Sequence, residues 1–62
     1  MKTRDILRLI REDGWIQIRQ TGSHAHFRHP TKPSIVTIPM HALSADVKKG
    51  TENSILKQAG LK

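Results

Sequence analysis

The chain has 62 residues, no cysteine, and a formal net charge of +6 from 11 Lys and Arg against 5 Asp and Glu. We expect one small domain over residues 1–62, with a thin core, which excludes large barrels, dinucleotide-binding folds and kinase-type active sites. The lack of cysteine excludes disulfides, thiolate zinc sites and thiol nucleophiles, and it suits a reducing cytoplasm. The positive charge favours a polyanionic partner such as nucleic acid, although it also serves solubility alone.

The N-terminal segment has the pattern of an amphipathic helix that Thr3 caps and Gly14 ends. Its apolar stripe consists of Ile6, Leu7, Leu9 and Ile10. The next segment, Trp15–Gln20, is rich in residues that favour strands, so we expect a first strand there. We expect Trp15 to pack in the core rather than stack on a base.

Two more strands are expected in the middle of the chain. Residues 21–23 form a turn, and His24–His29 alternates between apolar and polar side chains. Residues 30–34 contain two prolines and predict a loop, after which Ile35–Pro39 predicts the third strand. One face of these two strands is apolar and carries Ala25, Phe27, Val36 and Ile38.

The C-terminal third begins with a polar loop over Met40–Lys49, in which a short helical turn can carry Leu43 and Val47. Thr51 is expected to cap the last helix and Gly60 to end it. The apolar stripe of this helix consists of Ile55, Leu56 and Ala59.

The expected order is α-β-β-β-α, an α+β fold. Short connections predict a three-stranded antiparallel meander, and both apolar helices should cover one face of it. This is the arrangement of the double-stranded-RNA-binding domain, and it leaves the other face of the sheet free for function. If the apolar faces match, the residue numbers of cross-strand pairs in the second and third strands sum to an odd number. A sum near 65 pairs Phe27 with Ile38 and brings His24 close to His41.

Four histidines lie in the middle third of the chain: His24, His26, His29 and His41. Histidine both takes and gives a proton near neutral pH, which metal-independent cleavage of RNA requires. His24 follows Gly22, which lets a phosphate approach closely, and Ser23, which adds a hydroxyl. Each histidine can instead be a solvated or hydrogen-bonded surface residue. A metal site at His24 and His26 is a weaker alternative, because His29 falls on the other face of the expected strand and no carboxylate is nearby.

Several segments together resemble the HicA toxins of type II toxin–antitoxin systems. They are residues 22–27 (GSHAHF), 29–31 (HPT), 36–41 (VTIPMH), 49–51 (KGT) and 54–61 (SILKQAGL). They cover nearly the whole chain in the right order, and Gly14-Trp15 after an amphipathic helix also fits.

The resemblance implies a double-stranded-RNA-binding-domain-like fold and a ribosome-independent mRNA interferase that a HicB antitoxin holds inactive. The family's catalytic histidine follows its Gly-Ser pair and corresponds to His24. His41, His26 and Ser23 are candidate supporting residues. The candidate RNA-binding residues are Gly22, Arg19, Arg28, Lys32, Lys48 and Lys49. Of these, we expect Arg19, Arg28 and Lys32 to cluster around the His24 turn. We expect no metal and no other cofactor.

Two other functions remain open from the residues alone: a non-catalytic RNA-binding module of the same fold, and a protein whose open sheet face meets only another protein. No apolar signal core or membrane segment is evident, so we expect a cytoplasmic protein.

Overall fold

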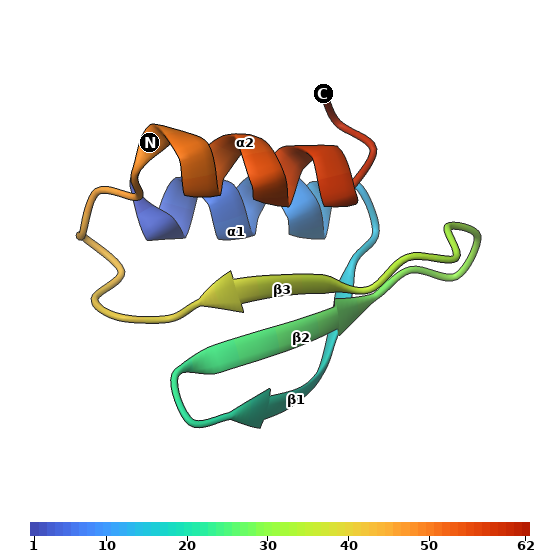
Figure 1. Ribbon diagram of the computed structural model, residues 1–62. Coiled ribbons are helices and arrows are strands. Elements are labelled where there is room, and N and C mark those ends of the chain that lie inside the picture. Colours follow the sequence, from blue (N-terminus) through green and yellow to red (C-terminus); the bar gives the residue numbers. More distant parts are fainter.

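The computed structural model describes residues 1–62 and has five elements in the expected order. They are α1 (Thr3–Glu12), β1 (Ile16–Thr21), β2 (His24–Arg28), β3 (Val36–Pro39) and α2 (Lys49–Gln58). The three strands form an antiparallel sheet in the order β1-β2-β3. Figure 1 shows α1 and α2 side by side on the same face of this sheet. The predicted α-β-β-β-α fold is therefore confirmed.

The core lies between the two helices and the sheet. Its buried apolar side chains are Ile6, Leu7, Ile10, Trp15, Ala25, Phe27, Val36, Ile38, Ile55 and Ala59. Trp15 and the four apolar strand residues are buried as predicted. Leu9 was expected in the stripe of α1 but is 38% exposed, and Leu56 is half-buried. The second face of the sheet carries no helix (Figure 1).

The two helix starts differ from the prediction. Thr3 does not cap α1 but is its first residue, with Lys2 at the cap position, and Thr51 lies inside α2, which Lys48 precedes. The Thr3 hydroxyl donates to the carbonyl of Ala45 at 3.3 Å and the Thr3 amide to the same carbonyl at 3.0 Å. Carbonyls of the loop before α2 therefore satisfy the free amides of α1, a task usually performed by a capping side chain.

The pairing of β2 with β3 has the predicted parity but not the predicted register. Phe27 lies opposite Val36, and His24 lies opposite Pro39, so the pair numbers sum to 63 rather than 65. Both Val36 and Ile38 are apolar, and a shift of two residues keeps the same side chains on the buried face. The alternation therefore predicts the face but cannot distinguish these two registers. His24 and His41 are not opposite each other.

The segment between β3 and α2 contains no helical turn of the kind expected around Leu43 and Val47. Residues 43–44 form a turn, and Lys2 and Asp46 form an isolated antiparallel bridge. Val47 packs against the core, whereas Leu43 is 54% exposed. Neither α1 nor α2 is long and apolar enough to cross a membrane.

Candidate functional site

The open face of the sheet is rich in basic and polar side chains. Alternation along β2 places His24, His26 and Arg28 opposite to the buried Ala25 and Phe27. The cross-strand partners of these three residues are Thr21, Arg19 and Ile16 in β1, with Pro39 and Thr37 in β3. Neither Arg19 nor Arg28 forms an ion pair, and the five acidic residues all lie outside the strands, at positions 5, 12, 13, 46 and 52. This face therefore presents positive charge that no carboxylate of the chain neutralises.

His24 is the first residue of β2 and lies at the turn between β1 and β2. Gly22 in this turn has φ +57°, and no atom lies within 4 Å of the position that a Cβ would take there. The Gln20 side chain donates to the Gly22 carbonyl at 3.1 Å and holds the turn. Ser23 and His24 are both exposed, and no intramolecular hydrogen bond involves the His24 ring. The ring is therefore free to bind a ligand from solvent.

His26 lies two residues further along the same face and is half-buried. Its Nδ1 is 3.0 Å from the Thr37 hydroxyl of β3, and Arg19 is its partner in β1. A β-bulge between Gln17 and Arg19 adjusts the alternation of β1 so that Arg19 reaches this register. Thr37 was not among the predicted site residues, although the pairing register, once known, identifies it.

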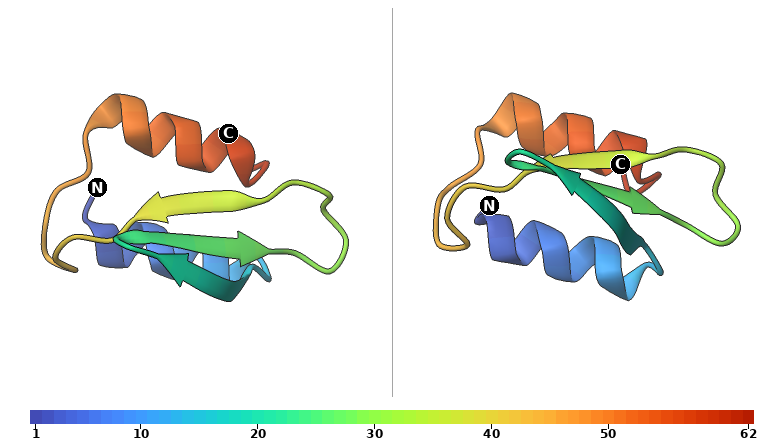
Figure 2. Two further views of the ribbon diagram at one scale, coloured as in Figure 1. Left: turned by 60° about the horizontal axis from the view of Figure 1, so that its bottom comes forward. Right: turned by 90° about the horizontal axis from the view of Figure 1, so that it is seen from below.

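His41 lies just outside β3, two residues beyond Pro39, which is the β3 partner of His24. It lines a cleft of about 210 Å³ together with Lys48 and with Thr3 and Thr51 from the two helices. Lys48 and Lys49 stand exposed at the start of α2. Figure 2 shows that the start of α2 and the turn between β1 and β2 lie at the same end of the molecule. Both lysines are therefore at the His24 end.

Arg28 and Lys32 do not cluster around His24, contrary to our expectation. Arg28 is at the opposite end of β2, about 13 Å along the strand. Lys32 lies in the loop between β2 and β3, which Figure 2 shows at the far end of the sheet. The Lys32 ammonium donates to the Asp13 carboxylate at 2.5 Å and to the Ala59 carbonyl at 2.9 Å. It is thus occupied within the fold.

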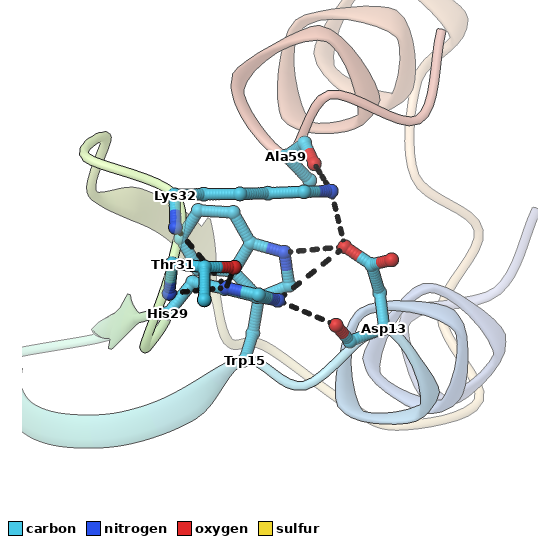
Figure 3. Close-up of polar contacts among 6 residues, drawn as sticks. All are labelled: Asp13, Trp15, His29, Thr31, Lys32 and Ala59. Atoms are coloured by element: carbon cyan, nitrogen blue, oxygen red, sulfur yellow. Dashed lines mark hydrogen bonds and ion pairs between the residues drawn. The ribbon is translucent and has the colours of Figure 1, made fainter.

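His29 and Lys32 belong to a polar network around Asp13, drawn in Figure 3. His29 Nε2 is 2.6 Å from the Asp13 carbonyl, so it carries the proton and donates it. His29 Nδ1 accepts from the amides of Thr31 at 3.1 Å and Lys32 at 3.2 Å. The Trp15 and His29 rings pack edge-on, with their centroids 5.2 Å apart. The Trp15 Nε1 donates to Asp13 Oδ2 at 3.1 Å. His29 therefore joins the end of α1 to the β2–β3 loop and has a structural role.

We expect the stability of the fold to depend on the ionisation of Asp13. The Lys32 hydrogen bond lowers the pKa of this carboxyl below 3.8; partial burial opposes the shift, and the Trp15 hydrogen bond adds to it. Because the folded pKa is below the unfolded value of 3.8, the stabilisation is fully present well above pH 3.8 and is lost as the pH falls through the folded pKa.

Urea unfolding of the native chain and of Asp13→Asn, at neutral pH and below pH 3.8, measures this dependence. Asp13→Asn should be less stable at neutral pH and should lose less stability on acidification. Equal acid sensitivity of the native chain and Asp13→Asn would show that this ion pair stabilises nothing.

A family model described as the HicA toxin of bacterial toxin–antitoxin matches residues 3–61, whereas a search of curated proteins found no match. The match runs from the first residue of α1 to just beyond α2, and so includes every strand and the turn before His24. The chain therefore belongs to the HicA toxin family, and it is the toxin of a pair whose other member is a cognate antitoxin.

Proposed function

We propose that the chain is an endoribonuclease, a ribosome-independent mRNA interferase that cleaves RNA on the open face of its sheet. The observation that carries the proposal is the composition of that face. It holds His24, His26, Arg19 and Arg28 and no carboxylate, and neither arginine forms an ion pair within the chain. Such a surface favours the binding of a nucleic acid, because its phosphates release bound counterions when they contact unpaired cations.

The proposed reaction is metal-independent cleavage with His24 in acid–base catalysis. An imidazole exposed to solvent can reach the ribose 2′-hydroxyl or the leaving 5′-oxygen of a bound strand. The open space at Gly22 and the hydroxyl of Ser23 admit the backbone beside it. Arg19 is the nearest cation by register, and it would stabilise charge that builds on the phosphate.

RNA is proposed to run along the open face, from Arg28 toward the turn before His24. Lys48 and Lys49, at the His24 end, extend the positive surface there. Lys32 has no part in this path, because its ammonium is held by Asp13 and Ala59. We further propose that the cognate antitoxin is of the HicB type and covers His24.

The test is incubation of the purified chain with RNA in the absence of ribosomes and in excess chelator. We expect cleavage that leaves a 2′,3′-cyclic phosphate and a 5′-hydroxyl, because 2′-hydroxyl attack expels the 5′-oxygen. Products bearing a 5′-phosphate would refute this mechanism. Binding without cleavage would favour a non-catalytic RNA-binding module.

Arginine variants test the proposed path. Arg28→Ala should weaken RNA binding and lower the slope of log affinity against log salt concentration by about 0.7, the value for one phosphate contact to a single strand. Arg4→Ala is the matched control, because Arg4 is equally exposed and unpaired but lies on α1. Titrations of labelled RNA at several salt concentrations measure both slopes. Equal effects of the two variants would show that binding depends on net charge and not on this face.

A further inference from the structure

We propose that His26 is a second proton-transfer residue, so that His24 and His26 act as an acid–base pair on one RNA linkage. The inference rests on the proposed endoribonuclease function and deepens it. His24 and His26 lie on the same face of β2 with only Ala25 between them, and Ala25 points into the core. The fold therefore presents two imidazoles to a strand bound on the open face.

The contact with Thr37 suits His26 to a change of protonation state. His26 Nδ1 lies 3.0 Å from the Thr37 hydroxyl, which fixes the ring and leaves Nε2 as the nitrogen not engaged by the protein. A hydroxyl both donates and accepts, so it can hold the imidazole in its neutral and its protonated form. The Thr37 backbone is fixed in turn, because its amide donates to the Gln58 side chain at 3.4 Å.

His29 shows the opposite arrangement. Its Nδ1 accepts from two backbone amides, which are donors only, so a proton on that nitrogen would break both hydrogen bonds. His41 lines a cleft shared with the two helices and is not paired with β2. Among the four histidines, His24 and His26 alone combine a place on the open face with a ring that can cycle its proton.

The spacing of the pair fits the geometry of the reaction. Two residues of a strand span about 6.6 Å. The attacking and leaving oxygens lie in line on opposite sides of the phosphorus, and each needs a ring nitrogen at about 2.6–3.2 Å. Two imidazoles at this separation can flank one phosphate. The side chain of Arg19, the β1 partner of His26, is close enough in register to bind its non-bridging oxygens.

The step balances without a co-reactant. One imidazole takes the proton of the 2′-hydroxyl while that oxygen bonds to phosphorus. The bond from phosphorus to the 5′-oxygen breaks, its electron pair stays on that oxygen, and the other imidazolium protonates it. The charged groups around His26 are Arg19 from β1 and Arg28 from its own strand, which also carries the titratable His24. β3 contributes the neutral Thr37, and no carboxylate faces His26.

The experiment compares His24→Ala and His26→Gln on one RNA with the natural linkage and on the same RNA with sulfur in place of the bridging 5′-oxygen. A thiolate leaves without protonation, so a missing acid no longer matters. We expect each variant to cleave the natural RNA about 10²- to 10⁴-fold more slowly. Only one of them, the variant that lacks the acid, should recover on the sulfur-bridged RNA. Each variant should also lose a different limb of the native bell-shaped pH profile.

Thr37 supplies a second test that leaves His26 in place. Thr37→Val should lower kcat by up to about tenfold, and Thr37→Ser should restore it, because only the hydroxyl orients the ring. Native-like cleavage and an unchanged pH profile in His26→Gln would overturn the proposal for His26 while the proposed function stood. Rescue of both variants by sulfur, or of neither, would also overturn the pair. Absence of RNA cleavage by the native chain would overturn the proposed function itself.

Discussion

Replacing His24 with alanine should abolish RNA cleavage and growth arrest while the fold stays intact. Loss of a general acid or base lowers kcat by about 10²- to 10⁴-fold. The His24 side chain is exposed and forms no hydrogen bond within the chain, so its removal should change the free energy of unfolding by no more than about 0.5 kcal/mol. Cleavage of labelled RNA, growth of cells that express the variant, and thermal unfolding measure the three quantities.

His41→Ala is the matched control for His24→Ala. His41 is also an exposed histidine, and it follows the end of β3 that pairs with His24. It lines the cleft near the starts of the helices rather than the open face of the sheet. We expect His41→Ala to cleave RNA at close to the native rate. A His24→Ala variant that remains fully toxic would refute the catalytic assignment. If both variants were inactive, the result would indicate that the catalytic site includes the cleft lined by His41.

The sequence predicted the faces of the strands better than their register. Alternation in β2 and β3 identifies Ala25, Phe27, Val36 and Ile38 as buried, since one apolar face must meet the helices. The same pattern is satisfied by two registers two residues apart. The β2–β3 loop is held by contacts of His29 and Lys32 with Asp13 and Ala59, which are distant in sequence and which the alternation does not show.

The candidate site was predictable in part for the same reason. His24 could be identified because Gly22 and Ser23 precede it, which is a local signal. In the structure these residues lie at an exposed turn. Lys32 looked equally available, because local sequence does not show that a carboxylate 19 positions earlier neutralises it. Thr37 could not be assigned to His26 without the register. Interactions across the fold decide which polar residues remain free for a ligand.

Replacing His29 with alanine should cause the largest loss of stability of any histidine change. The side chain is only 10% exposed, and its ring joins the Asp13 carbonyl to the amides of Thr31 and Lys32 while packing against Trp15. Removal leaves these groups without partners and opens a cavity, a cost of about 2–3 kcal/mol. The free energy of unfolding of a domain of this size is about 3–9 kcal/mol in total, so this loss is a large fraction of it. Thermal unfolding should show a midpoint about 10–20 °C lower.

Glycine variants test the contact between the His29 ring and the Asp13 carbonyl without changing His29 itself. Gly14 has φ +104°, and a Cβ there would lie 2.9 Å from His29 Nε2, so Gly14→Ala forces the ring away from the Asp13 carbonyl. Gly22→Ala is the matched control, because Gly22 also has positive φ but faces open space, and it should cost only the backbone strain of about 1–2 kcal/mol. We expect Gly14→Ala to lower the unfolding midpoint well beyond Gly22→Ala. In the double variant with His29→Ala, the extra cost of Gly14→Ala should fall, because the ring it displaces is absent and only the backbone strain at φ +104° remains. An extra cost that is undiminished in the double variant would show that strain at Gly14, rather than its contact with His29, accounts for the loss.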